Sequence, residues 1–320
     1  MAHIEIENLT FSYPSAGRPS LSNVSLTIRR GEYVVLCGKS GSGKTTLLRH
    51  LKSVLAPHGK RSGDIRINGV SLKDMSQRDQ AAKVGFVMQN PDDQIVTDKV
   101  WHELAFGLES LGCDQKTMRA RVAEMACYFG IQDWFHRDVA NLSGGQKQLL
   151  NLASIMAMQP EILILDEPTN GLDPNQIRQI RELIKGLAEN HTIILSTHIL
   201  SEVEMICNKV IIIDQGTIKA ADTPSNLTAN LRAAGKITLE FRGDLPLVTE
   251  KLEAMEHVKK VIHEGTDADG WHTLTVRAEA GTDTREKAAR LLAEQGCPLR
   301  HIYRHTPTLE EVFVEMTRKD

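Results

Sequence analysis

The stretch "GKSGSGKT", residues 38–45, decides the fold of this chain. It fits the pattern G-x-x-x-x-G-K-[ST] and lies between the apolar segment "YVVLC" (33–37) and "KTTLLRHLKSVL" (44–55), which we interpret as a buried strand and a helix. Glycines let backbone N–H groups face a phosphate, and the N-terminus of a helix favours the same anion. The stretch therefore predicts a phosphate-binding loop in an α/β nucleotide-binding domain.

Four side chains supply the chemistry expected around this loop. Lys44 can reach the β- and γ-phosphates of a nucleotide, and the Thr45 hydroxyl can ligate Mg²⁺. Downstream, "ILILDE" (162–167) reads as a buried strand that ends in Asp166 and Glu167. Asp166 can hold the Mg²⁺ shell, and Glu167 can orient or deprotonate an attacking water. Alone, such a run is usually a strand entering a loop, but its pairing with the phosphate loop favours catalysis.

Composition and charge narrow the classes of function. The chain has 320 residues, enough for two domains with their own cores. A net charge of -3 gives no basic footprint, so we expect no nucleic-acid partner. The N-terminus "MAHIEIENLTFSYP" alternates in polarity, unlike a signal peptide, and no apolar run approaches the ~18 residues of a membrane span. If the protein works at a membrane, it therefore needs a partner there.

Two patterns divide the chain. Up to about residue 225, strands alternate with helices, which predicts a largely parallel sheet covered by helices. The order β-α-β-β-α-β beyond that point predicts a small ferredoxin-like α+β domain. We expect domains at 1–228, with a helical subdomain at about 90–158, and at 235–320, with a linker near 225–235.

The expected elements can be given by range. Helical periodicity covers 98–130, and a further helix is expected at "ILSEVEMIC" (199–207). The small domain is expected to have strands at 236–242, 258–264, 271–278 and 298–304 and helices at 246–256 and 284–295. A last helix begins at "TLEE", where Thr308 and Glu311 have capping-box spacing.

A third motif, "LSGGQ" (142–146), indicates the family. Ser143 stands where a helix N-cap belongs, and two glycines let a phosphate approach bare N–H groups. In isolation, these five residues could be only a capped helix start. They precede "ILILDE" by one helix, however, and a "GLD" turn (171–173) follows it. Together the segments resemble the ATP-binding cassette (ABC) ATPases over essentially residues 1–225.

This resemblance implies a fold and a composite site. The core would be an ABC-type P-loop NTPase with a mostly parallel sheet, an antiparallel β subdomain and a helical subdomain. Two cassettes would meet head to tail, so that Ser143 and Gly145 cap the γ-phosphate held by the other subunit. Residues 170–173 match a turn that touches the opposite subunit.

The resemblance also implies individual roles. Tyr13 matches an aromatic residue that stacks on adenine, although a tyrosine at a strand edge is the alternative. Gln89 matches an amide near Mg²⁺ and the water, and His198 matches a histidine that contacts the γ-phosphate. The expected catalytic residues are Glu167, His198, Gln89 and Lys44. The expected nucleotide-binding residues are Tyr13, Gly38, Lys39, Ser40, Gly41, Ser42, Gly43, Lys44, Thr45, Thr46, Ser143, Gly144, Gly145, Gln146 and Asp173, and the expected Mg²⁺ ligands are Thr45, Gln89 and Asp166.

Transport is the function that the resemblance favours, with ATP and Mg²⁺ as cofactors. Expected partners are integral membrane transporter subunits and a second ABC ATPase subunit, which places the chain peripherally on the cytoplasmic face of the membrane. A soluble ribosome- or DNA-associated ATPase is the alternative from another class. Such relatives usually carry two cassettes or long coiled coils, and neither is found in this sequence.

Two parts of the sequence resemble transporters that work in opposite directions. Residues 1 to about 166, above all 89–112 and 142–169, resemble the ATPases of energy-coupling-factor (ECF) importers of vitamins or metal ions. The remainder, including "TPTLEEVFVEMT", resembles cassettes of exporters for drugs, ions or polysaccharides. In this family the membrane partner docks beside the loop of Gln89, in the importer-like part, so uptake is our prediction. The motor of an ABC exporter is the alternative.

The segment "MQNPDDQIV" (88–96) carries that loop. We expect Gln89 to sense phosphate and metal and residues 90–94 to contact the transporter. Turn chemistry alone is the alternative for the Asn-Pro-Asp sequence, because these residues favour turns.

Overall fold

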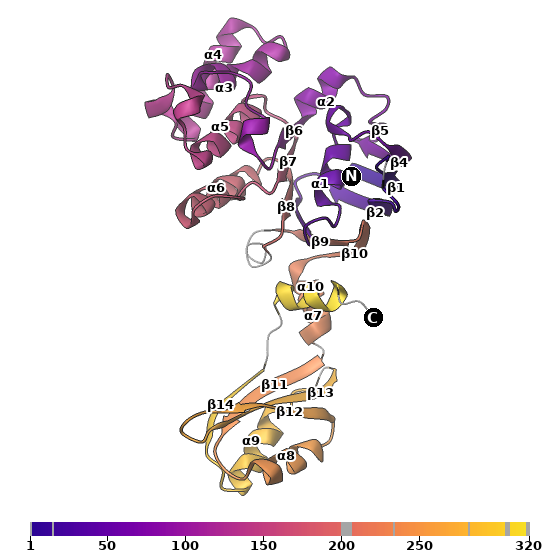
Figure 1. The fold of residues 1–320 in the computed structure, drawn as a ribbon, viewed down its shortest axis with the longest axis vertical. Helices are drawn as coiled ribbons and strands as arrows, with labels where there is room; N and C mark the ends of the chain where they lie inside the picture. Colours follow the sequence, from indigo (N-terminus) through magenta and orange to yellow (C-terminus); the bar gives the residue numbers. More distant parts are fainter. Residues whose placement is uncertain are drawn as a thin grey trace. The chain divides into compact units, whose positions relative to one another are not determined.

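The computed structural model describes residues 2–14, 16–199, 207–232, 234–280, 282–304 and 308–317 (Figure 1). The chain forms two compact units, Met1–Thr223 and Pro224–Asp320. The expected domain limits, 1–228 and 235–320, stay a prediction. The expected helix at 199–207 lies largely outside the described residues.

A six-stranded sheet forms the centre of the first unit, in the order β10-β9-β3-β8-β7-β6. Its strands from β9 to β6 are parallel, as predicted, and β10 is antiparallel to β9. Because parallel strands are covered on both faces, their sequences are almost continuously apolar. The strands are β3 Tyr33–Cys37, β6 Val84–Val87, β7 Ile162–Asp166, β8 Thr192–Thr197, β9 Lys209–Asp214 and β10 Thr217–Asp222.

An antiparallel sheet in the order β2-β1-β4-β5 packs against this centre, as the resemblance implies. One face of it is buried, and residues of both sheets, such as Ile6 and Val34, belong to one hydrophobic core. From Val24 to Arg29, buried or half-buried residues alternate with exposed ones, the period of two expected of a sheet with one covered face. The strands are β1 Ala2–Ser12, β2 Leu21–Arg29, β4 Lys60–Ile67 and β5 Val70–Ser71.

The helix after the phosphate-binding loop, α1 (Lys44–His50), is shorter than the expected 44–55. Lys52 takes an extended backbone, and a 3-10 turn follows at Ser53–Leu55. The cause is tertiary, because the N–H and hydroxyl of Ser53 both donate to the side-chain oxygen of Gln80. Gln80 is buried on α2 (Gln77–Lys83), a helix that the sequence analysis missed.

The other helices of this unit are α3 (Val100–Ser110), α4 (Gln115–Tyr128), α5 (Gly144–Ala157) and α6 (Pro174–Leu187). The helical periodicity of 98–130 is confirmed as α3 and α4. The chain leaves α3 through Gly112, whose φ of +70° suits glycine.

The second unit has the expected ferredoxin-like order, with an antiparallel sheet β12-β13-β11-β14. Helices α8 and α9 bury one face of this sheet, where Phe241, Leu252 and Leu292 are inaccessible to solvent. Thr308 and Glu311 form the predicted reciprocal capping contacts at the last helix. The elements are β11 Ala234–Phe241, α8 Leu245–Glu253, β12 Val258–Thr266, β13 His272–Ala280, α9 Arg285–Glu294, β14 Leu299–Arg304 and α10 Leu309–Thr317.

Most of the segment expected as a linker, near 225–235, is helix α7 (Pro224–Arg232). Pro224 suits a first helical position, and the Thr228 hydroxyl donates back to its carbonyl. The segment is mostly polar, but its apolar residue Leu227 is buried, with 4% of its surface exposed. Across the described ranges, no helix of either unit is long and apolar enough to cross a bilayer.

A buried histidine ties α1 to the antiparallel sheet. The Nδ1–H of His50 donates to the Thr46 carbonyl at 2.6 Å, and its ring packs edge-on against Phe11. The opposite nitrogen, Nε2, is buried without a hydrogen-bond partner. Burial is the main cause that lowers the pKa of His50, and the nearby Arg61 lowers it further. Burial therefore favours the neutral form of the ring in the folded chain.

This arrangement makes stability depend on pH. Because the pKa is lowered on folding, the unfolded chain binds more protons below its ordinary pKa of about 6.5, and the free energy of unfolding falls as pH falls through that value. We expect the Tm of the wild-type chain to drop between pH 7.5 and 5.5 and His50→Asn to reduce that drop. His58→Asn, at an exposed histidine, is the control. An equal drop in all three proteins, measured by calorimetry, would contradict the assignment.

Candidate functional site

The phosphate-binding loop forms one wall of a cavity of about 380 Å³. Its shape requires glycine, since a Cβ on Gly38 would lie 2.5 Å from the Ile213 carbonyl oxygen, and Gly43 has a φ of +108°. The expected nucleotide-binding residues on Gly38–Thr46 are thus brought together on one loop and the first turn of α1. The cavity is lined by Tyr13, Ser20, Ser40, Gly41, Gly43, Lys44, Thr45, Thr46, Gln89 and Glu167.

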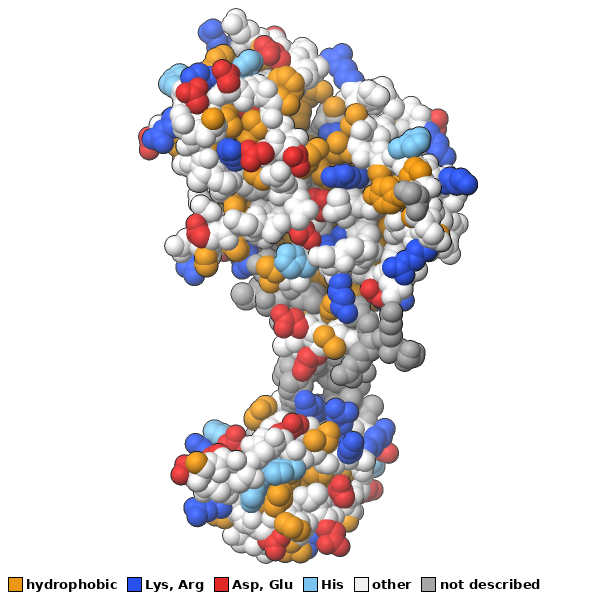
Figure 2. Space-filling view, in the orientation of Figure 1, with side chains coloured by type: hydrophobic (Ala, Val, Ile, Leu, Met, Phe, Trp, Pro, Cys, Tyr) orange, Lys and Arg blue, Asp and Glu red, His pale blue; other side chains and the backbone are white. Residues whose placement is uncertain are grey.

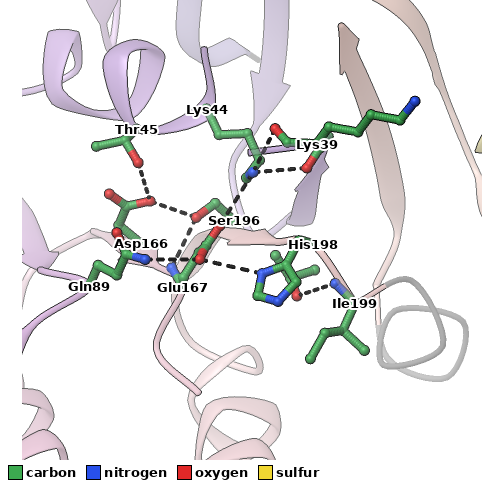
Figure 3. Close-up of polar contacts among 11 residues, drawn as sticks. Lys39, Lys44, Thr45, Gln89, Asp166, Glu167, Ser196, His198 and Ile199 are labelled. Atoms are coloured by element: carbon green, nitrogen blue, oxygen red, sulfur yellow. Dashed lines mark hydrogen bonds and ion pairs between the residues drawn. The ribbon is translucent and has the colours of Figure 1, made fainter. Parts of the chain in front are cut away.

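Lys44 opens α1 and is only 5% exposed. Its ammonium donates to the carbonyl oxygen of Gly38 at 2.8 Å and contacts the Glu167 carboxylate at 3.3 Å (Figure 3). A buried cation is stable only when hydrogen bonds and an opposite charge compensate for lost hydration. The loop carbonyl and Glu167 provide both, and they hold the ammonium at the cavity.

Asp166 ends β7, 2% exposed, beside the loop. It accepts hydrogen bonds from the hydroxyls of Thr45 at 3.1 Å and Ser196 at 2.7 Å. Burial raises the pKa of Asp166, and the bonds from Ser196 and Thr45 oppose that shift. The oxygens of Thr45, Asp166 and Gln89 are the hard donors that Mg²⁺ prefers, so these residues fit the predicted ion.

Glu167 has a left-handed backbone, with a φ of +46°. Such a conformation is uncommon for a residue with a side chain and is often found at functional sites. The carboxylate accepts a hydrogen bond from the Gln89 side-chain amide at 3.0 Å, and His198 Nδ1 lies 3.4 Å from the same oxygen. The four expected catalytic residues, Glu167, His198, Gln89 and Lys44, therefore meet at one carboxylate (Figure 3).

Ser196 is a site residue that the sequence analysis missed. It pairs with Asp166 in the register of β7 and β8. Its hydroxyl donates to Asp166 and accepts from the backbone N–H of Glu167 at 3.0 Å, so it fixes both acids. A signal was present, because polar residues at the carboxyl ends of neighbouring parallel strands meet at one edge of the sheet.

Tyr13 lies at the mouth of the cavity, 37% exposed. Its ring packs edge-on against Phe11, and its hydroxyl is 3.2 Å from that of Thr46. The ring is therefore positioned by the fold while part of it stays open to a ligand.

The LSGGQ residues do not line this cavity. Ser143 is the N-cap of α5, as predicted, in a capping box with Gln146. Asp173 is the N-cap of α6 in a second capping box, with Gln176. These groups are at helix starts of their own, as expected if they act on a nucleotide of another subunit.

Comparison with known proteins identifies the family. The profile described as "ABC transporter" matches residues 21–170. An energy-coupling factor transporter ATP-binding protein, EcfA1 of Latilactobacillus sakei, is 38% identical over 253 residues, which cover 78% of this chain and 87% of that protein. The chain belongs to the ABC transporter ATP-binding proteins. The matched residues 21–170 lie within the first unit, in agreement with the resemblance in its sequence.

Two further relatives show how much of a related protein the chain spans and which solved structure its fold resembles. A Bacillus thuringiensis protein named for ABC transporter ATP binding is 44% identical over 250 residues, and the match spans 78% of this chain but 45% of that protein. The chain thus spans less than half the length of this relative. The solved structure of cbiO1 from Clostridium perfringens, named as part of the ABC transporter complex cbiONQ, superposes with a TM-score of 0.63 at 28% identity and covers 79% of this chain and 94% of its own.

Ser196→Ala tests the support of the two acids. It leaves a buried carboxylate and the Glu167 N–H each short of one hydrogen bond, so we expect the free energy of unfolding to fall by about 1–3 kcal/mol. We expect kcat for ATP hydrolysis to fall about tenfold, which corresponds to about 1.4 kcal/mol in the barrier.

Ser71→Ala is the matched control, since its hydroxyl donates to Asp64 at 2.7 Å outside the cavity lining. An equal loss of kcat in both variants would contradict a specific role for Ser196.

Proposed function

We propose that the chain is the ATP-hydrolysing subunit of an ECF-type transporter. It would dimerise on ATP and drive uptake of a vitamin or metal ion through a separate membrane partner. One observation carries the proposal: a single carboxylate, Glu167, is held by an amide, an ammonium and an imidazole beside a phosphate-binding loop. The names of the relatives support the assignment to transport.

The chemistry follows from these contacts. Glu167 is 12% exposed and has neighbours that fix its direction, so it suits a base that orients and deprotonates water. Lys44 stabilises negative charge on the β- and γ-phosphates, Gln89 orients the water, and His198 contacts the γ-phosphate. Thr45, Asp166 and Gln89 would hold Mg²⁺, which neutralises phosphate charge when bound.

A second cassette completes the proposed site. The N-terminus of α5, with its glycines, presents N–H groups and a partial positive charge that suit a γ-phosphate. Because Ser143 and Asp173 do not line the cavity of their own chain, we propose that they act on the nucleotide of the other subunit. Tyr13 would stack on the adenine.

The membrane partner has a candidate groove on the cassette. A cavity of about 480 Å³ lies between α2, α3 and α5. Apolar side chains line it, among them Val96 and Phe106, which are 62% and 43% exposed. Figure 2 shows hydrophobic side chains gathered in the region of α3 and α5. Exposed apolar patches of this kind suit a protein partner. The chain would thus lie peripherally at the cytoplasmic face of the membrane.

Glu167→Gln tests the proposed base. The amide keeps the shape but cannot take a proton, so we expect kcat to fall at least about a hundredfold while ATP still binds. With Mg-ATP, light scattering should then report a doubled mass. Unchanged turnover would refute the assigned base, and a persistent monomer would argue against a homodimeric site.

Phe106→Glu tests the groove. A charge in an apolar docking surface opposes burial, so we expect the tagged full-length chain to lose its co-purified membrane protein in the native host while its ATPase activity in isolation persists. Tyr128→Glu, at an aromatic residue 50% exposed on α4, is the control. Recovery of the same membrane protein with Phe106→Glu would rule out this groove.

A further inference from the structure

The segment that follows Gln89 is bound to the helix that begins with the LSGGQ motif. Residues 91–93 form a 3-10 turn. The Lys147 ammonium on α5 contacts the Asp92 carboxylate at 2.6 Å. One turn further along α5, the Asn151 amide donates to the Pro91 carbonyl at 3.1 Å. Because Lys147 and Asn151 are four residues apart, they lie on one face of the helix, and both bind this turn.

The other side of the turn is bound to the central sheet. The side-chain oxygen of Gln94 accepts the Met88 N–H at 2.8 Å, and its amide donates to the Phe86 carbonyl at 3.3 Å. Inside the turn, the Asn90 side chain accepts the Asp92 N–H at 3.3 Å. Gln89, which is exposed, is thus followed directly by a turn that is bonded to β6 and to α5. This bonding also gives Asn90, Asp92 and Gln94 roles within the cassette, in line with the alternative based on turn chemistry.

The face of α5 that carries Lys147 and Asn151 passes three sites that the proposed function involves. The helix begins next to Ser143, passes the turn at Lys147 and Asn151, and continues to Ser154 and Met158, which line the groove of the proposed membrane partner. At 14 residues, α5 is about 21 Å long. A packed helix of this length moves as a rigid body, so displacement at the groove reaches both the turn and Ser143.

We propose that Lys147 and Asn151 are positioning residues that couple Gln89 of one ATP site to Ser143 of the other. The inference rests on the proposed function, because it takes Gln89 as acting on its own subunit's nucleotide and Ser143 as acting on the opposite one. A change in the turn that moves Gln89 also moves α5 and therefore the LSGGQ motif. The two composite sites of a dimer are then linked through this pair of contacts.

The two contacts differ in strength. Asp92 is 63% exposed, so its ion pair is screened by water and contributes little alone. Asn151 is 0% exposed, and the bond it donates to a backbone carbonyl would be costly to lose. Asn151 is therefore the stronger contact, and Lys147 adds a contact that can be reversed in charge without altering the core.

Steady-state kinetics on the full-length chain separate positioning from folding. We expect kcat to fall about tenfold in Asn151→Leu and about threefold in Lys147→Met, since the Asn151 contact is the costlier to lose. We expect the Kd for ATP to stay within about twofold of the wild-type value. The Hill coefficient for ATP should fall towards one in both variants, because the sites lose their link.

A charge swap distinguishes positioning from general damage. Asp92→Lys combined with Lys147→Asp restores an ion pair of opposite polarity, so its kcat and Hill coefficient should return to within about twofold of the wild-type values. Lys99→Met is the matched control, since Lys99 contacts Asp138 at the same 2.6 Å without touching the turn.

The outcomes are distinct. Unchanged kcat and Hill coefficient in Asn151→Leu and Lys147→Met, with ATPase activity in the unaltered chain, would overturn the coupling and leave the proposed function standing. A loss in Lys147→Met that the swap does not restore, or that Lys99→Met reproduces, would also overturn it. Absence of ATP hydrolysis by the unaltered chain would refute the proposed function and the coupling together.

Discussion

The buried ammonium of Lys44 is the constraint on which the site depends. A cation that is 5% exposed must be compensated, and the compensation comes from two places far apart in sequence, the Gly38 carbonyl and Glu167. The loop after β3 is thereby fastened to the end of β7. Glu167 takes a left-handed backbone to reach this position. The uncommon backbone is localised at the residue that we propose as the base, and Ser196 supports it by accepting the Glu167 N–H.

Features whose causes are local could be predicted from the sequence. The phosphate-binding loop, the caps at Ser143 and Thr308 and the β-α-β-β-α-β order of the second unit all depend on residues a few positions apart, so composition and spacing reveal them. Apolar continuity likewise indicated the parallel strands, because both of their faces are covered.

Features with tertiary causes could not be predicted in the same way. Helix α1 stops early because Gln80, far along the chain, binds Ser53. The polar end of β8 was a signal for Ser196, but its contact with Asp166 depends on β8 lying next to β7, which spacing along the chain does not encode. The contact between Lys147 and Asp92 joins residues that read separately as a solvated lysine and a turn acid. Helix α7 was missed for a local reason. The polar composition of this segment was interpreted as a linker, although Pro224 can open a helix.

The two helix starts outside the cavity, at Ser143 and Asp173, lie next to each other. The capping box of α5 uses the N–H groups of Ser143 and Gln146, so those of Gly144 and Gly145 take no part in it. The Gln176 side chain packs closely on Gly145, since a Cβ there would lie 2.4 Å from its amide carbon. Gln176 is itself the box partner of Asp173. The Gln176 side chain therefore joins the helix start at Asp173 to the helix start at Ser143.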